Sequence, residues 1–428
     1  MKIGYVGLGA MGRALAGHLV GRHDLLVWDL NPQALGEFVK RGAQAAESLA
    51  DIGAQCDVVL LCLPKSAHVQ ETLFGSNGLA ETLAPGAVVV DQTSGIPSDS
   101  RAFADKLAAR NIALIDAPVA GGVPSAIAGQ ITIMASGPRT AFERVLPVLA
   151  TISPKVYRCS DHVGDGQTVK AINNMINAAY RMVTLEVLAV GRKLGLSAAA
   201  MTDALNAGVA RSFISYRLLP AVVERRSSTD FALALMVKDL NQAADLGVAT
   251  ATPMPISDVA RGMMNMSLNF LGPDGRLDDI VPFMEKLTGA DFAGDVPPDR
   301  FKMDPALAMQ LVIATAATCN RAIAVENTAL AFRAGLELTG FEPVISAGSA
   351  SSAQAELLFA ALGAEGAGFA GSVGQDVDSL TEFARVAADC GVPALMVNQV
   401  RAQYLSFTAH AGPDRPIQDM INYQLGTI

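Results

Sequence analysis

The strongest constraint on the fold of this chain is an internal repeat. Matching residues of its two copies are separated by one fixed number of positions, the number that separates Glu186 from Glu326. We call this spacing the repeat offset, and it needs no gap over the matched region. The further matched pairs are Gly195-Leu196 with Gly335-Leu336, Ala207-Gly208 with Ala347-Gly348, Pro253 with Pro393, Arg261 with Arg401, and Gly272-Pro273-Asp274 with Gly412-Pro413-Asp414. Self-similarity at one offset is typical of a duplicated structural unit. The chain is therefore predicted to contain the same helical domain twice.

Only the first copy keeps the side chains that can carry out proton chemistry. Four polar residues of the first copy are replaced in the second: Lys170 by Gln310, Asn174 by Ala314, Lys238 by Asp378, and Asp239 by Ser379. Both lysines are lost together. This divergence indicates a working copy followed by a structural one.

Length and composition limit the classes of function. A chain of 428 residues is long enough for two or three domains. A net charge of −9 disfavours broad binding to nucleic acids or anionic membranes, whereas a small anionic substrate needs only one or two local cations. No unbroken apolar run approaches the roughly 18 residues of a membrane span. The first expected strand begins at Lys2, which leaves no room for a signal peptide.

The cysteines and histidines predict neither disulfides nor a metal centre. Five cysteines are scattered and odd in number, and the five histidines form no pair at ligand spacing. We therefore expect reduced thiols, a cytoplasmic protein and no metal.

Residues 1 to about 160 alternate β-branched runs with amphipathic stretches, which predicts βαβ units on a parallel sheet. The expected strands are Lys2–Val6, Leu25–Asp29, Val58–Leu63, Ala87–Asp91, Ala113–Asp116 and Ile131–Ala135. Long helices follow, the first from Gln167 to Leu194 with Gly195 as its C-terminal cap. The predicted fold is an α/β Rossmann-type N-terminal domain followed by two homologous all-α domains. The predicted boundaries are 1–163 for dinucleotide binding, 164–290 for catalysis, 291–305 for a linker and 306–428 for the second copy.

Gly7, Gly9 and Gly12 form a G-x-G-x-x-G loop between the first expected strand and a helix. The first glycine permits a tight turn, the second lets backbone approach a pyrophosphate, and the third lets the helix pack on the strand. Asp29 ends the second strand, where a carboxylate can accept from ribose hydroxyls and would repel a 2′-phosphate. The alternative is a structural glycine turn beside a solvated Asp29. The joint pattern favours NAD over NADP.

A polar stripe follows on the first long helix. Lys170, Asn174, Asn177 and Arg181 lie at i, i+4, i+7 and i+11, among largely apolar neighbours. Buried polar groups need partners, and burial lowers the pKa of a lysine toward the range useful for proton transfer. The alternatives are an exposed polar face or a structural salt bridge. The second copy retains only Arg321 of the four, which favours a functional stripe.

Several motifs together resemble the β-hydroxyacid dehydrogenase family, which includes 3-hydroxyisobutyrate dehydrogenases and tartronate semialdehyde reductases. The resemblance covers residues 1 to about 290. The motifs are GLGAMG at 7–12, Leu63-Pro64, DAPVAGG at 116–122, Gly164-x-Gly166-x-x-x-Lys170-x-x-Asn173-Asn174, and Phe231 ahead of Lys238-Asp239-Leu240.

The resemblance implies a role for each matching residue. Lys170 would be the general acid/base, and Asn174 would orient the substrate hydroxyl. The backbone of Gly121 and Gly122 would hold the substrate carboxylate, while Lys238 would close the pocket beside the nicotinamide. The implied cofactor-binding residues are Gly7, Gly9, Ala10, Met11, Gly12, Asp29, Leu63, Pro64, Ser94, Phe231 and Lys238. The expected function is NAD-dependent hydride transfer between a small β-hydroxyacid and its semialdehyde or keto form.

Three departures from the family pattern concern the substrate. Ala120 replaces the serine of DAPVSGG, Asp161 replaces a glycine before the catalytic helix, and the segment 91–95 (DQTSG) replaces the usual DMST. The reaction class survives these changes, but they leave the identity of the acid open.

The fused second helical copy resembles 6-phosphogluconate dehydrogenases, whose helical domain also looks duplicated. Residues 306–428 would replace a partner subunit's helical domain and leave a monomer or a homodimer. A ligand site of its own is the competing hypothesis, although no polar cluster replaces the lost residues.

Three other functions are each disfavoured by particular residues. A 6-phosphogluconate dehydrogenase-like enzyme would carry a GNKGTGxW-type motif in its helical domain, but Trp28 is the single tryptophan of the chain. The retained Lys170 disfavours an imine reductase. The retained pair Lys170 and Lys238 disfavours a dinucleotide sensor without turnover.

Overall fold

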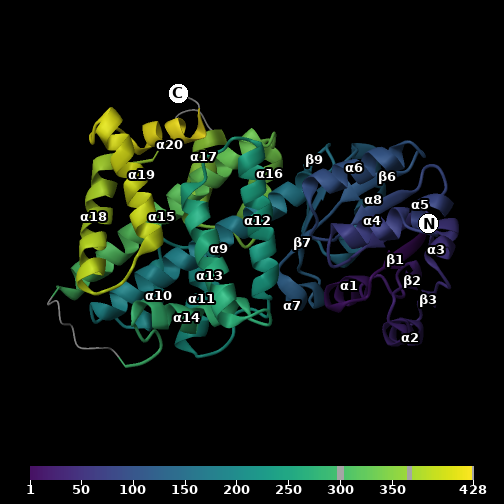
Figure 1. The fold of residues 1–428 in the computed structure, drawn as a ribbon, viewed down its shortest axis with the longest axis horizontal. Coiled ribbons are helices and arrows are strands. Elements are labelled where there is room, and N and C mark those ends of the chain that lie inside the picture. The colour runs from purple at the N-terminus through teal and green to yellow at the C-terminus, as the bar shows by residue number, and fades with distance from the viewer. Residues whose placement is uncertain (296–302, 364–368, 427–428) are drawn as a thin grey trace. The chain divides into compact units, whose positions relative to one another are not determined.

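A computed structural model describes residues 1–295, 303–363 and 369–426 (Figure 1). These residues form two compact units. The first contains residues 1–170 and 339–344, and the second contains residues 171–338 and 345–428. The predicted linker at 291–305 falls partly on 296–302, which lie outside the described residues.

The first unit is built on a nine-stranded sheet in the order β3-β2-β1-β4-β5-β6-β8-β7, with β9 paired to β8. The strands are β1 (Lys2–Val6), β2 (Asp24–Trp28), β3 (Gln44–Ala45), β4 (Val58–Leu61), β5 (Val88–Asp91), β6 (Ala113–Asp116), β7 (Val119–Ala120), β8 (Thr132–Ser136) and β9 (Val156–Ser160). The helices are α1 (Ala10–Ala16), α2 (Pro32–Lys40), α3 (Leu49–Gln55), α4 (Ser66–Phe74), α5 (Leu79–Thr82), α6 (Pro97–Ala108), α7 (Gly122–Ile127) and α8 (Arg139–Ile152). This architecture confirms the predicted Rossmann-type fold.

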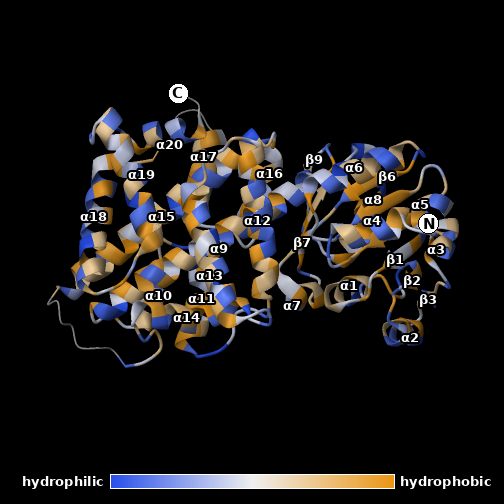
Figure 2. Cartoon of the chain, viewed as in Figure 1, coloured by the Kyte–Doolittle hydropathy of each residue, from blue (hydrophilic) through white to orange (hydrophobic). Residues whose placement is uncertain are grey.

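The central strands are apolar on both faces, because helices cover the sheet on both sides. In β4, Val58 and Leu60 pack into one hydrophobic cluster, while Val59 and Leu61 pack into another. These strands are predominantly hydrophobic in Figure 2. Such continuous apolar runs made the central strands predictable from the sequence.

The predicted parallel sheet is confirmed for β1 to β6, but the sheet also contains an antiparallel strand that was not predicted. Strand β8 runs antiparallel to both β6 and β7. Three strands, β3, β7 and β9, were also missed. Two of them have only two residues, and β9 (VYRCS) is largely half-exposed and carries Arg158, so no buried apolar run marks it. Hydrophobic periodicity locates a strand but does not give its direction.

The second unit is helical and shows the repeat directly. Helix α9 (Asp165–Lys193) begins in the first unit and continues into the second. The further elements are α10 (Ala198–Asn206), α11 (Phe213–Val223), α12 (Leu233–Ala249), α13 (Pro255–Leu271), η1 (Leu277–Asp279), α14 (Ile280–Thr288), α15 (Pro305–Arg333), α16 (Leu338–Ala347), α17 (Ala353–Gly363), α18 (Val373–Asp389), α19 (Leu395–Ala411) and α20 (Ile417–Leu425). The repeat offset converts the bounds of α9, α11, α12 and α13 into those of α15, α17, α18 and α19.

Helix α15 is long and apolar enough to cross a membrane by length and composition. Its most apolar window is 78% buried inside the structure, which is the behaviour of a core helix. The sequence showed no membrane-length apolar run here, because polar residues such as Asn320 and Arg321 interrupt the helix.

The two helical copies pack against each other through reciprocal contacts. Each of two buried carboxylates accepts two backbone N–H groups from the first turn of a helix in the other copy: Glu186 from Met396 and Val397, and Glu326 from Ile256 and Ser257. The repeat offset exchanges one set for the other. Such an exchange is the signature of two-fold symmetry between identical surfaces. The chain therefore contains a pseudo-symmetric pair of helical copies.

A short backbone ladder marks the pseudo-symmetry axis. Ser212 bridges to Ser352, which is its own counterpart in the repeat. On either side, the N–H of Phe213 donates to the carbonyl of Ser351 at 2.8 Å, and the N–H of Ala353 donates to the carbonyl of Arg211 at 2.9 Å. These backbone bonds hold the two copies together whatever their side chains.

The buried caps predict a pH dependence of stability. Burial raises the pKa of both Glu186 and Glu326 to about 7, although each accepts backbone hydrogen bonds. These pKa values exceed the ordinary value of 4.5, so between pH 4.5 and about 7 the folded state binds more protons than the unfolded state. The stability of the fold therefore falls as the pH rises through about 7. A Glu186→Gln/Glu326→Gln variant should show a flatter fall in the thermal midpoint between pH 5 and pH 8, measured by circular dichroism.

The matched control is Glu47→Gln, which alters an exposed carboxyl and should keep the wild-type pH profile. Asp91 and Asp116, whose pKa values are also raised by burial, should preserve part of the slope in the double variant. An unchanged slope in the double variant would show that the two caps do not titrate in this range.

Candidate active site

The glycine loop between β1 and α1 has room for a side chain at one of its three glycines and none at the other two. A Cβ on Gly7, whose φ is +96°, would lie 2.3 Å from the carbonyl oxygen of Cys62. A Cβ on Gly12 would lie 2.0 Å from the carbonyl oxygen of Gly7, so α1 packs directly on the loop. At Gly9, by contrast, no described atom lies within 4 Å of the Cβ position. Close packing at the first and third glycines with open space at the second suits a pyrophosphate against the backbone.

The predicted cofactor-binding residues of the first unit gather at one edge of the sheet. Strand order reverses between β1 and β4, and the carboxyl ends of parallel strands at such a point form the usual nucleotide crevice. The loops and helix that follow β1, β2, β4 and β5 carry these residues: Ala10 and Met11, Asp29, Leu63 and Pro64, and Ser94. The start of α1 has no side-chain cap, so its first N–H groups are available to phosphate oxygens.

Asp29 is tied to the glycine loop. One carboxylate oxygen accepts the N–H of Leu8 at 2.5 Å, and the other accepts the N–H of Asn31 at 2.7 Å. The side chain remains partly exposed. This geometry suits a carboxylate that accepts ribose hydroxyls, and its charge opposes a 2′-phosphate.

Gly121 and Gly122 start α7 with φ values of +131° and +76°. Both values lie in the region that favours glycine, so the turn requires these residue types. The preceding Ala120 is buried in β7 and paired with Thr132 of β8. The departure from the family serine therefore leaves only a methyl group at this position.

The start of α9 is fixed by a buried carboxylate. Asp116, at the end of β6, accepts the N–H groups of Gly164 and Gln167, both at 2.8 Å. The hydroxyl of Ser136 donates to Asp116 and accepts the N–H of Gly166. Burial raises the pKa of Asp116 to about 6, although these hydrogen bonds lower it. Asp116 thus caps the helix that carries Lys170.

Gln167 fastens the same helix to the loop after β5. Its side-chain oxygen accepts the N–H of Gly95 at 2.9 Å, and its amide nitrogen donates to the carbonyl of Thr93 at 2.7 Å. These contacts flank Ser94 and lie one turn before Lys170, which is buried. Neither a role for Gln167 nor the capping role of Asp116 was predicted from the sequence. The position of Asp116 in the DAPVAGG segment was the available signal.

In the helical unit, Asn174 and Lys238 meet at one carboxylate. The amide nitrogen of Asn174 donates to Asp239 at 2.6 Å, and the ammonium of Lys238 lies 3.1 Å from the other oxygen of Asp239. Asn174 and Asp239 are buried, whereas the side chain of Lys238 is 29% exposed. The structure therefore brings these two predicted site residues together across α9 and α12. Asp239 is the link between them.

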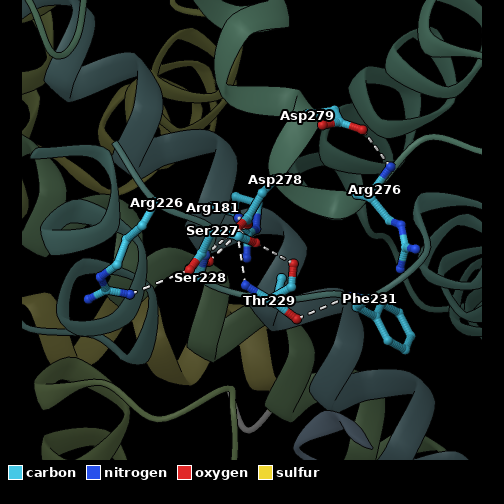
Figure 3. Close-up of polar contacts among 9 residues, drawn as sticks. All are labelled: Arg181, Arg226, Ser227, Ser228, Thr229, Phe231, Arg276, Asp278 and Asp279. Atoms are coloured by element: carbon cyan, nitrogen blue, oxygen red, sulfur yellow. Dashed lines mark hydrogen bonds and ion pairs between the residues drawn. The ribbon is translucent and has the colours of Figure 1, made fainter. Parts of the chain in front are cut away.

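The rest of the polar stripe is also buried, which excludes an exposed polar face. Arg181 forms a structural salt bridge with Asp278, in which a guanidinium nitrogen lies 2.9 Å from a carboxylate oxygen (Figure 3). Asp278 also accepts the hydroxyl of Ser228 at 2.8 Å and the N–H of Thr229 at 3.0 Å. Burial raises the pKa of Asp278, but Arg181 and these bonds lower it below its ordinary value.

The Asp278 contacts hold the loop that leads to Phe231. The N–H of Phe231 donates to the hydroxyl of Thr229 at 3.2 Å, and the carbonyl of Phe231 accepts the N–H of Leu277 at 2.8 Å. Phe231 is thereby anchored two residues before α12 begins (Figure 3).

Two family models match consecutive parts of the chain. The model described as the NAD binding domain of 6-phosphogluconate dehydrogenase matches residues 2–164. The model described as NAD-binding of NADP-dependent 3-hydroxyisobutyrate dehydrogenase matches residues 164–283. The whole second helical copy, residues 306–428, lies beyond both matches.

Relatives and solved structures agree with these matches. L-threonate dehydrogenase of Cupriavidus necator is 32% identical over 281 residues, which are 65% of this chain and 94% of the relative. The 3-hydroxyisobutyrate dehydrogenase structure from Salmonella typhimurium is 31% identical, has a TM-score of 0.56, and covers 66% of this chain and 98% of its own. Plasmodium falciparum 6-phosphogluconate dehydrogenase, at 14% identity, shares the fold with a TM-score of 0.75 over 99% of this chain and 95% of its own.

The fold and glycine loop, together with these relatives, define an oxidoreductase that uses a nicotinamide dinucleotide and acts on a CH–OH group. The chain belongs to the β-hydroxyacid dehydrogenase family. Its reaction class is hydride transfer between a hydroxyacid and its semialdehyde or keto form. The likeness to 6-phosphogluconate dehydrogenase extends over both helical copies and confirms the predicted overall architecture.

Asp29 generates a prediction about cofactor choice. Replacing it with serine removes the negative charge and a charge-assisted acceptor, so the ratio of kcat/KM for NAD⁺ to that for NADP⁺ should fall by about 10- to 100-fold. Steady-state kinetics with both cofactors measures this ratio. Asp24→Ser, at the opposite end of the same strand, is the control and should leave it unchanged. An unaltered ratio in Asp29→Ser would remove Asp29 from cofactor selection.

Proposed function

We propose that this protein is an NAD-dependent dehydrogenase of a small β-hydroxyacid, with Lys170 as the general acid/base. The glycine loop and Asp29 would hold the dinucleotide, which would supply hydride-transfer chemistry at the carbon that bears the hydroxyl group. Lys170, in its uncharged form, takes the hydroxyl proton in oxidation and returns it to the carbonyl oxygen in reduction.

The remaining residues of the proposed site orient the substrate. Asn174, one helical turn after Lys170 on α9, contacts the substrate hydroxyl and sets its direction. The backbone N–H groups of Gly121 and Gly122 hold the carboxylate. Lys238 adds a positive charge that suits an anionic substrate.

The single observation that carries the proposal is the rigid support of α9 around Lys170. Asp116 and Gln167 fix the helix one turn before Lys170, and Asp239 fixes Asn174 one turn after it. A proton donor must be held within hydrogen-bond reach of the reacting oxygen to act as a general acid. Buried polar side chains on a helix that is anchored on both sides of Lys170 meet that requirement.

A second candidate substrate class is a phosphosugar acid. It is favoured by the shared fold with 6-phosphogluconate dehydrogenase over nearly the whole chain. The low identity of 14% limits that likeness to the fold. A small unphosphorylated acid is favoured by the relatives at above 30% identity, which are named for threonate and 3-hydroxyisobutyrate.

The first test is NADH formation across a panel: 3-hydroxyisobutyrate, glycerate, threonate, 3-hydroxypropionate and 6-phosphogluconate. We expect turnover of one unphosphorylated acid and, in Lys170→Ala, a fall in kcat of at least about 100-fold, because general acid–base catalysis contributes that much. Glu47→Ala, a substitution of an exposed residue, is the control. Turnover of 6-phosphogluconate alone would favour the second candidate. Silence across the panel in a protein that still binds NADH would favour a sensor or an unlisted acid.

We also propose that the second helical copy takes the place of a partner subunit's helical domain. The support is the set of reciprocal caps, in which Glu326 of the second copy closes the start of α13 in the first. Relatives of ordinary length align with only about two thirds of this chain.

Truncation after Gly289 tests this substitution. The fragment lacks the Glu326 cap and exposes the buried face of α9, so it should aggregate or self-associate, as measured by light scattering after size exclusion. The full-length chain is the reference. A soluble and fully active fragment with the oligomeric state of the full chain would refute the proposal.

A further inference from the structure

The second helical copy lacks the catalytic lysine, yet one of its turns contacts the helix that carries that lysine. This turn, residues 348–350, lies in the segment 348–352 that connects α16 to α17. The hydroxyl of Ser349 accepts a hydrogen bond from the side-chain amide of Asn173 at 2.9 Å. The carbonyl of Ser349 accepts one from the amide of Asn177 at 2.8 Å. A single residue of the second copy thus contacts α9 on both sides of Asn174.

These contacts continue into the proposed substrate-binding residues. The amide nitrogen of Asn173 also donates to the side-chain oxygen of Asn174 at 3.1 Å. An amide whose oxygen is engaged in this way points its nitrogen elsewhere, and the nitrogen of Asn174 donates to Asp239 at 2.6 Å. Asp239 in turn holds Lys238. The chain of contacts therefore runs from Ser349 through two asparagines to the Asp239–Lys238 pair.

The pseudo-symmetry supplies an internal comparison. The counterparts of Asn173, Asn177 and Ser349 in the repeat are Ile313, Ala317 and Val209, all apolar. The backbone ladder around Ser212 and Ser352 is present on both sides of the axis. On the other side of the axis, the side-chain amides of Asn320 and Gln354 donate to the carbonyls of Ala210 and Val209. Among the described residues, the side-chain contact from Asn173 to the hydroxyl of Ser349 has no counterpart there, because Val209 takes the place of Ser349.

Because the asparagines are buried, the orientation of their side chains depends on the contact with Ser349. Asn173, Asn174 and Asn177 expose only 0%, 4% and 5% of their surfaces, so water does not substitute freely for a lost partner. With its nitrogen bound to Ser349 and Asn174, the Asn173 amide has one preferred orientation. Without Ser349 Oγ, the amide can rotate and release the oxygen of Asn174.

We propose that Ser349 is a positioning residue for the dehydrogenase reaction, supplied by the second helical copy. It orients Asn174 through Asn173 and so sets the direction of the substrate hydroxyl. This inference rests on the proposed function, in which Asn174 contacts the substrate. It gives the second copy a role in the reaction beyond covering an apolar face.

The kinetic test compares Ser349→Ala with Ser349→Thr and Ser351→Ala. Ser349→Ala should raise KM for the hydroxyacid about threefold to tenfold, the effect of one lost hydrogen bond, and leave KM for NAD⁺ unchanged. Threonine keeps the hydroxyl and should restore KM. Ser351→Ala alters a neighbouring hydroxyl of the same loop and should have no effect. Equal KM values in Ser349→Ala and wild type would overturn the proposal.

A double-mutant cycle separates positioning from a general loss of stability. In an Asn174→Ala background, Ser349→Ala should change KM less than twofold, because its effect passes through Asn174. An undiminished effect in that background would show that Ser349 acts by another route and would overturn the proposal.

A spectroscopic experiment tests this inference independently of the proposed function. In protein labelled with ¹⁵N-asparagine, Ser349→Ala should shift the side-chain amide signals of Asn173 and Asn174, whereas Ser351→Ala should not. If the wild type oxidises no acid and these signals still shift, the proposed function fails and the orienting contact stands. If the wild type is active and the Asn174 signal does not move, the inference fails.

Discussion

The structure depends on the complete burial of one helix. Helix α9 runs for 29 residues, and nearly every residue from Asp165 to Arg192 is buried. A buried helix that carries polar side chains is stable only when each of them finds a partner. Asp239, Asp278 and Ser349 provide partners for polar side chains of the helix, while Asp116 accepts backbone N–H groups at its start. The helix is therefore held at many points, and a rigid helix suits residues that must orient a substrate.

Duplication offers a simple route to this burial. The differences between the copies then indicate which residues serve the architecture and which serve the proposed chemistry. A second copy of the same domain supplies the apolar surface that α9 needs, and the interface is pseudo-symmetric because both surfaces derive from one unit. The caps by Glu186 and Glu326 and the backbone ladder persist in both halves, so they belong to the architecture. Gln310, which takes the place of Lys170, is exposed, while α15 is buried from Thr315 to Ala331. The fold therefore did not depend on the lysine that was lost.

The sequence by itself determined the class of fold and the class of reaction. The glycine loop, the apolar runs of β1, β4 and β5, and the repeat at one fixed offset are local or periodic signals, and each led to the correct element. Short or half-exposed strands such as β3 and β9 gave no such signal. The antiparallel direction of β8 could not be predicted either, because hydrophobic periodicity records burial but not strand direction.

Only the tertiary structure decided how the polar residues of α9 are satisfied. The spacing of Lys170, Asn174, Asn177 and Arg181 placed them on one stripe, but gave no means to separate the salt bridge at Arg181 from the network at Asn174. The partners of Asn174, Asn177 and Arg181 lie 65 to 172 residues away along the chain. Helical periodicity fixes which side chains share a face, whereas the partner of each depends on how distant segments pack. For that reason the capping role of Asp116 and the contact of Ser349 emerged only from the folded chain.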